Sequence, residues 1–162
     1  MNEREIAQIV TATIKQFEQE KEVRMTLSIA KEIIRKVILK AEQMGVKAVV
    51  AVSDGGANPV CVECMDDSYI ASYDIAVNKA FTVVSLKMPT KDLKTLAAPG
   101  GSLYGIQFTN GGKIVIFGGG VPLKVGDRII GGLGVSGGTE EEDTYLADYG
   151  LSLFEEEKLW KR

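Results

Sequence analysis

The chain has 162 residues, of which 45% are hydrophobic and 25% charged, and its net charge is −3. These values are typical of one globular domain, and the acidic balance argues against nucleic acid as a partner, which needs a basic face. No apolar run approaches the roughly 18 residues of a membrane span, and the acidic start is unlike a secretory signal. We therefore expect a cytoplasmic protein without nucleic-acid or membrane partners.

Residues 1–17 predict an amphipathic helix. Its apolar side chains share one stripe: Ile6, Ile9, Val10, Ile14 and Phe17. Residues 18–24 are charged and unpatterned, which predicts a connector, so we divide the chain into residues 1–24 and a domain of residues 25–162. The helix either packs on the domain or a neighbouring subunit, or it is a recognition helix that docks into a groove of a partner.

The next segments predict a helix and a hairpin. Thr26 to Met44 is amphipathic and ends at Gly45. Val46 to Val52 is apolar on both faces, as in a central strand covered on both sides. A turn follows, and Val60 to Met65 returns as the second arm of the hairpin.

The second arm carries a C-x-x-C motif, Cys61 and Cys64, in a chain without histidine. A closed zinc site needs about four Cys or His ligands. Strand positions three apart face opposite sides, which is poor geometry for a chelate or a disulfide. We favour two ordinary strand cysteines and no metal site over a redox role.

The middle of the chain predicts two further helices. One runs from about Ser68 to Leu86 with Asp66 or Asp67 as its cap, and Asp74 and Asn78 on it are one turn apart and could hydrogen-bond. Thr90 to Leu96 is a short helix, and residues 97–112 are rich in loop residues.

Residues 113–136 predict strands with an unusual face. Ile114 to Phe117 is a strand-length run ended by three glycines, and Gly126 begins a two-residue turn that suits type II′. The strand after it alternates between two faces. One holds Ile129, Leu133 and Val135, and the other holds Ile130, Gly132, Gly134 and Ser136. Either a packed helix or a flat ligand approaches the glycine face, and we favour the helix because it needs nothing beyond the chain.

A capping box, Thr139 with Glu142, begins a helix that we expect to end at Gly150, before a short last helix to Trp160. Four acidic residues in its first turn would repel a phosphate. We therefore expect no nucleotide site at this terminus.

Four segments taken together resemble the GlcG/HbpS-like family, also called haem-degrading or DUF336 domains, which includes the C-terminal domain of PduO-type corrinoid adenosyltransferases. The segments lie at residues 49–56; at 65–66 with 72–76 and 79–82; at 118–123; and at 130–138 with Asp143. The resemblance spans about residues 26–150. It implies an α/β (α+β) single domain with a mainly antiparallel sheet of about five strands flanked by helices, often in homo-oligomers.

The resemblance also implies a ligand pocket and a class of ligand. The implied pocket residues are Asp66, Asp74, Lys79, Gly119, Gly120, Gly134 and Ser136. An alternative for Asp74 and Lys79 is an ion pair on a helix surface or an interface. Family members imply haem or corrinoid (cobalamin) binding. A histidine ligand is absent here, and Met65, Cys64, Tyr73 or a lysine could ligate iron without any being singled out.

Three functions are compatible with these features. The first is a non-catalytic accessory protein of a bacterial catabolic operon that binds a small molecule. The second is microcompartment cargo, because residues 1–17 resemble an encapsulation peptide; this would place the protein in the compartment lumen with shell proteins as partners. The third is an enzyme acting on a small metabolite or cofactor, although no nucleophile, base and orienting group stand out together.

Overall fold

The computed structural model describes residues 1–161, except for the side chains of residues 17 and 19–22, so Phe17 of the predicted stripe lies outside the described side chains. The helices are α1 (Glu3–Glu22), α2 (Leu27–Met44), α3 (Ile70–Ser85), α4 (Thr90–Leu96) and α5 (Glu140–Glu156). The strands are β1 (Val49–Asp54), β2 (Pro59–Cys64), β3 (Gly120–Val125) and β4 (Arg128–Ser136). Single 3₁₀ turns lie at Ile106–Phe108, Asn110–Gly112 and Leu159–Lys161.

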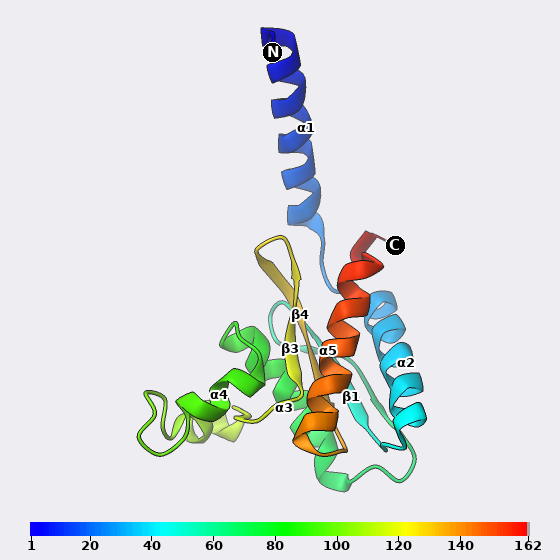
Figure 1. Ribbon diagram of the computed structural model, residues 1–162, viewed down its shortest axis with the longest axis vertical. Helices are drawn as coiled ribbons and strands as arrows, with labels where there is room; N and C mark the ends of the chain where they lie inside the picture. Colours follow the sequence, from blue (N-terminus) through cyan, green and yellow to red (C-terminus); the bar gives the residue numbers. More distant parts are fainter. Residues whose placement is uncertain (162) are drawn as a thin grey trace.

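Within residues 1–161 the strands form one antiparallel sheet in the order β2-β1-β4-β3. Helices α2 and α5 pack on one face and α3 packs on the other (Figure 1). The predicted α+β class is confirmed, with one strand fewer than expected. The run Ile114–Phe117 is not a strand, because the N–H of Val115 donates to Thr82 Oγ1 at 3.0 Å and ties this segment to α3.

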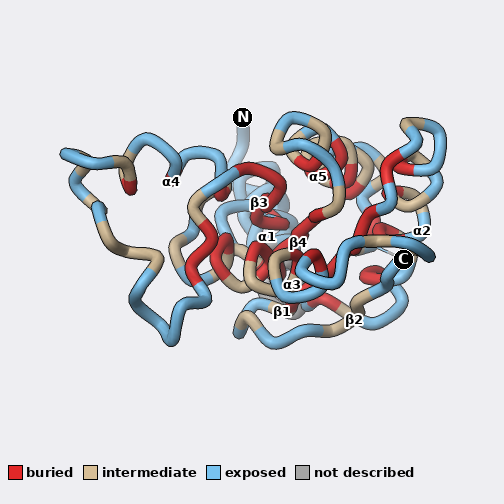
Figure 2. Tube along the Cα trace, turned by 90° about the horizontal axis from the view of Figure 1, so that it is seen from below, coloured by how far each residue is buried: buried red, intermediate tan, exposed pale blue. Residues whose placement is uncertain are grey.

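The main core lies between the sheet and the pair α2–α5. Figure 2 shows buried residues concentrated in these elements, whereas the chain around α4 is mostly exposed. Strand β1 contributes to both faces, with Val50 and Val52 in the main core and Val49 and Ala51 against α3. The prediction of a central strand covered on both sides is therefore confirmed.

The glycine face of β4 is covered by α3. A Cβ added at Gly134 would lie 2.7 Å from the backbone N of Ala80, and one at Gly132 would lie 2.6 Å from a methyl of Val83. Helix packing, the favoured interpretation, is confirmed. The predicted alternation is wrong at Ile130, because the pairing between β3 and β4 shifts there and Ile130 joins the main core.

Most predicted turns and caps are confirmed. Thr26 and Gly45 cap α2, and Gly126, with φ of +57°, begins the turn between β3 and β4. The predicted cap of α3 is wrong: its N-cap is Tyr69, without a side-chain hydrogen bond.

Helix α5 begins at the predicted capping box but does not end at Gly150. A Cβ at this position would lie 2.5 Å from Leu133 Cδ2 and 2.9 Å from Val37 Cγ2. The glycine therefore allows α5 to approach the sheet and α2 closely, and the helix continues to Glu156.

Helix α1 extends away from the domain (Figure 1). A capping box of Asn2 and Glu5 begins it, and it reaches Glu22 rather than residue 17, because the charged residues after 17 include good helix formers. Ile6, Ile9 and Ile14 are exposed. Among the described helices, none combines the length and apolarity that a membrane span requires.

Candidate functional site

A buried lysine on α3 is paired with a buried aspartate on α5. Lys79 is fully buried, and its Nζ donates to Asp143 Oδ2 at 2.8 Å and to the carbonyl oxygen of Val135 at 2.6 Å. The ring centroid of Phe117 lies 5.0 Å from the same nitrogen. Burial lowers the pKa of Lys79 and raises the pKa of Asp143, and in each case it outweighs their mutual attraction.

The surrounding backbone is shaped to hold this pair. The N–H of Gly138 donates to Asp143 Oδ1 at 2.9 Å. Gly119 has a φ of +106°, and a Cβ there would lie 2.6 Å from Lys79 Nζ and 2.8 Å from Asp143 Cβ. A side chain at residue 119 would therefore displace the ion pair.

A hollow of about 250 Å³, which we call the inner pocket, lies beside the pair. Three of its polar side chains are almost completely buried: Ser72 is 3% exposed, Ser136 5% and Asp143 4%. The hydroxyl oxygens of Ser136 and Ser72 are 3.1 Å apart. Its lining residues are Tyr69, Ala71, Ser72, Ile75, Phe117, Ser136, Gly137, Gly138, Glu140 and Asp143.

Exposed apolar side chains lie at this pocket and in the first turn of α3. We call them the rim: Tyr69 (71% exposed), Ile70 (98%), Tyr73 (54%) and Phe117 (38%). Tyr69 and Phe117 also line the inner pocket. Tyr69 and Tyr73 are four residues apart at the start of α3, so their side chains point to the same side of the helix.

The inner pocket is lined by a second carboxylate, Glu140, which is paired with Lys94. Glu140 accepts a hydrogen bond from Lys94 Nζ at 2.5 Å and one from the N–H of Gly118 at 3.1 Å. These two bonds hold the pKa of Glu140 below its ordinary value, so it is ionised at neutral pH.

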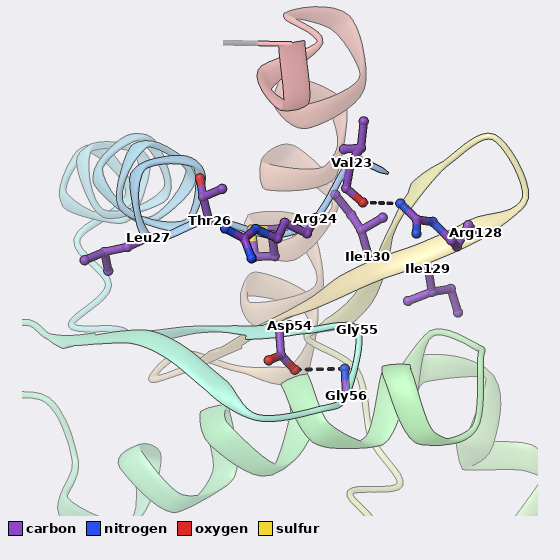
Figure 3. A pocket seen from close by; sticks show the side chains of 11 residues that line it. Val23, Arg24, Thr26, Leu27, Asp54, Gly55, Gly56, Arg128, Ile129 and Ile130 are labelled. Atoms are coloured by element: carbon purple, nitrogen blue, oxygen red, sulfur yellow. Dashed lines mark hydrogen bonds between the residues drawn. The ribbon is translucent and has the colours of Figure 1, made fainter. Parts of the chain in front are cut away.

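A second hollow, the connector cleft, lies between the segment that joins α1 to α2, the β1–β2 turn and the start of β4, with a volume of about 520 Å³ (Figure 3). Asp54 in it accepts hydrogen bonds from the N–H groups of Gly56 and Asn58 at 2.8 and 2.9 Å, and Arg128 donates to the carbonyl of Val23. These polar groups hold the chain's own turns together. None of the predicted site residues lines this cleft.

The structure places the predicted residues in three groups. Lys79, Gly119 and Ser136 lie at or directly behind the inner pocket. Gly134 lies against α3, and the N–H of Gly120 donates to Thr90 Oγ1 at 2.9 Å.

Asp66 and Asp74 form the third group, exposed and not part of the pocket lining. Asp74 bonds to Asn78 at 3.0 Å, as the spacing predicted. The alternative of an ion pair at Lys79 on a helix surface is wrong, because Lys79 is buried and its partner is Asp143.

The ion pair of Asp143 with Lys79 and the contact of Ser72 with Ser136 were not predicted from the sequence. Asp143 lies on the buried stripe of α5, at helical spacing with Leu146, Ala147 and Gly150. An acidic residue on an apolar stripe is the signal that could have found it. Ser72 had no comparable signal, since a small hydroxyl residue is common on any helix face.

The remaining candidate ligands are the cysteines and Met65 of the β2 region. Both cysteines are free thiols, and burial together with Glu63 raises the pKa of Cys61. The sulfur of Met65 accepts the N–H of Ala48 at 3.3 Å, which occupies it. Across the described residues no three His, Cys, Asp or Glu side chains gather as a metal site.

The fold and the inner pocket together define a small α+β domain with a polar pocket beside the helix that covers the glycine face of its sheet. The chain belongs to the family of haem-degrading HbpS-like proteins, whose model matches residues 25–152.

Among individual relatives, a 15.0 kDa protein from the dhaT–dhaS intergenic region of Citrobacter freundii is 43% identical over 132 residues, which are 82% of this chain and 93% of that protein. The corrinoid adenosyltransferase PduO of Citrobacter freundii is 33% identical over 134 residues, and the match spans 82% of this chain but 40% of PduO.

Solved structures agree with this assignment. Klebsiella pneumoniae ORFY, described as a DUF336 protein, has a TM-score of 0.80 and 40% identity, with 83% of this chain and 94% of that chain covered. The PduOC–haem complex has a TM-score of 0.78 and 33% identity, with 80% and 94% covered.

Proposed function

We propose that this protein is a non-catalytic accessory protein of a bacterial catabolic operon that binds a small molecule of the haem or corrinoid class. The observation that carries the proposal is the junction of an exposed apolar rim with a pocket of buried polar side chains. A related domain was solved as a haem complex, and another relative is a corrinoid adenosyltransferase, which supports a tetrapyrrole as the ligand.

The residues present fit a macrocycle bound on an open face. The inner pocket, at about 250 Å³, is too small to enclose a tetrapyrrole, so the ring would lie on Tyr69, Ile70 and Tyr73. Tyr73 supplies a phenol oxygen on this face, and tyrosine is a known haem ligand. A bound haem would supply a redox-active iron, and the chain's own residues would hold the ring and exclude water from one side.

Absorbance titrations with haemin and with cob(II)alamin test this proposal. We expect a saturable, stoichiometric shift of the Soret or corrin band, and at least tenfold weaker binding for Tyr69→Ala. For haemin, Tyr73→Phe should change the spectrum because it removes the phenol oxygen. Tyr104→Phe, an exposed tyrosine outside the rim, is the matched control. If neither compound gave a saturable shift, the proposal would be wrong.

A second candidate function is microcompartment cargo directed by α1. The apolar stripe of α1 is exposed at Ile6, Ile9, Val10 and Ile14, and the helix extends away from the domain (Figure 1). An amphipathic helix of this kind binds by placing its apolar face in a groove, here one on a shell protein.

A fluorescent reporter fused to residues 1–24 tests this function in compartment-forming cells. We expect punctate fluorescence that Ile9→Glu abolishes, while Gln8→Glu, off the stripe, leaves it unchanged. Diffuse fluorescence of the unaltered fusion would rule this function out.

We also infer that the protein forms homo-oligomers. Phe108 is 83% exposed, and an apolar side chain in such a position is commonly covered by another subunit. Light scattering should give a mass of at least two chains, and Phe108→Ser should lower it. A monomer at all concentrations would contradict the inference.

A further inference from the structure

The two serines of the inner pocket leave one hydroxyl proton without an acceptor. A hydroxyl group has one proton to donate and two lone pairs that accept. The contact between Ser136 and Ser72 uses one of their two protons. Among the described residues no atom accepts the other, although both hydroxyls are buried. The pocket therefore presents one hydrogen-bond donor to whatever occupies it.

The two carboxylates of the pocket supply hydrogen-bond acceptors. Asp143 receives hydrogen bonds from the N–H of Gly138 and from Lys79, and the N–H of Gly137 also interacts with its carboxylate, so at least one of its four lone pairs stays free. Glu140 is the second carboxylate in the lining. The cation of Lys79 is fully buried and does not line the hollow. Donors on a ligand can therefore be satisfied, whereas negative charge on it would face two carboxylates.

The charge and bonding of the pocket restrict the chemistry of its ligand. A carboxylate or phosphate would meet Asp143 and Glu140 first, because Lys79 and Lys94, which pair with them, do not line the pocket. An ammonium group would satisfy the acceptors, but it has no lone pair for the serine proton. A neutral group that both donates and accepts, such as a hydroxyl or a primary amide, satisfies both requirements.

We propose that the inner pocket is selective for a neutral hydroxyl or primary amide group bound between the serine pair and Asp143, and that it excludes carboxylates. Its volume of about 250 Å³ holds on the order of eight water molecules at about 30 Å³ each, so a group of a few heavy atoms fits. The inference shares the pocket with the proposed function but does not depend on a tetrapyrrole, because free small molecules test it.

Titration of the ¹⁵N-labelled full chain with acetamide, ethane-1,2-diol, acetate and methylamine tests the selectivity. Acetamide and acetate have nearly the same shape and differ in charge. We expect saturable shifts of the Ser72, Gly137 and Gly138 amide signals with acetamide and the diol. Acetate and methylamine, at matched ionic strength, should bind at least tenfold more weakly. Equal binding of acetate, or unsaturable shifts with both neutral probes, would overturn the proposal.

Variants separate the site from general solvent effects. The double variant Ser72→Ala/Ser136→Ala removes the donor and should weaken acetamide binding about tenfold. Ser152→Ala, which removes an exposed hydroxyl on α5, should not change it. If the double variant does not fold, Ser72→Ala alone gives a smaller loss in the same direction. Unchanged binding in the folded double variant would contradict the assignment.

A competition experiment with cyanocobalamin, whose periphery carries primary amides, identifies the source of the bound group. If cyanocobalamin weakens acetamide binding, the group that occupies the pocket is a side chain of a macrocycle. If acetamide binding is unchanged, the group belongs to a free metabolite. Saturable acetamide binding without any tetrapyrrole binding would remove the proposed function and leave this inference standing.

Discussion

The two faces of the sheet are built differently. The face under α2 and α5 is covered by large apolar side chains such as Ile33, Leu133 and Phe154, all fully buried. The face under α3 has glycines in β4, small residues in α3 and the buried Lys79, whose partner Asp143 comes from the first turn of α5.

Because of this difference, one face mainly supplies folding stability and the other supplies the groups that can bind a ligand. Close-packed apolar side chains supply most of the free energy of folding. A buried ion pair contributes little net stability, because desolvation offsets the attraction. We therefore expect substitutions of the apolar core residues between the sheet and the pair α2–α5 to change stability alone, and substitutions beside the ion pair of Lys79 and Asp143 to change the site as well.

The largest expected effect is at Gly134. In Gly134→Val the side chain would meet the backbone of α3 and push the helix from the sheet. We expect a loss of roughly 4 kcal/mol or more in the free energy of unfolding, measured by urea denaturation. Lys124→Val, at an exposed position on β3, should be tolerated. A Gly134→Val protein as stable as the unaltered chain would show that α3 does not pack as described.

The next effect is at the ion pair. Lys79→Met leaves Asp143 buried without its cation, which should cost about 3–5 kcal/mol in urea denaturation. Lys79→Met/Asp143→Asn removes the charge and should recover part of the loss. If the double variant were less stable than Lys79→Met alone, the uncompensated carboxylate would not be the cause.

A substitution in the apolar core tests the same difference on the α2–α5 face of the sheet. Leu133→Ala should cost about 2–5 kcal/mol in the free energy of unfolding, because it removes a fully buried side chain between the sheet and α5. Its affinity for acetamide should stay unchanged while the protein is folded. Leu27→Ala, at an exposed position, is the control. If folded Leu133→Ala bound acetamide more weakly, the two faces would not have the separate roles described.

The smallest effect is at Asp54, in the turn after β1. Burial alone would raise its pKa, but the hydrogen bonds from Asn58 and Gly56 hold it below the ordinary value. Because the folded-state pKa is depressed, the resulting stability is present above about pH 4 and is lost as pH falls through the folded-state pKa.

Asp54→Asn should therefore make folding stability depend less on pH in the acidic range. Thermal unfolding at a series of pH values between 2 and 7 measures this dependence. If the stability of Asp54→Asn and that of the unaltered chain fell equally with decreasing pH, this explanation would be wrong.

Local signals in the sequence were sufficient for most of the fold. The caps of α2, the turn at Gly126 and the two-sided apolarity of β1 each have one physical cause that acts within a few residues. Gly150 and Ile114–Phe117 were predicted wrongly because their roles depend on distant neighbours, Leu133 and Thr82. A glycine that ends a helix and one that admits a neighbouring side chain look the same in sequence.

The candidate site was less predictable. Lys79, Gly119 and Ser136 came from the family resemblance, and periodicity alone would not have grouped them. The pairing of Lys79 with Asp143 joins residues 64 apart, and no local pattern determines such a contact.

The most direct test is a map of where a tetrapyrrole binds, by ¹⁵N amide titration of the full chain with cyanocobalamin and zinc protoporphyrin. We predict saturable shifts at Tyr69, Ser72, Tyr73, Gly137 and Gly138, on the α3 face. Saturable shifts confined to Arg24, Leu27 and Gly55 would place the ligand in the connector cleft. That result, or the absence of saturable shifts with both compounds, would contradict the proposed site.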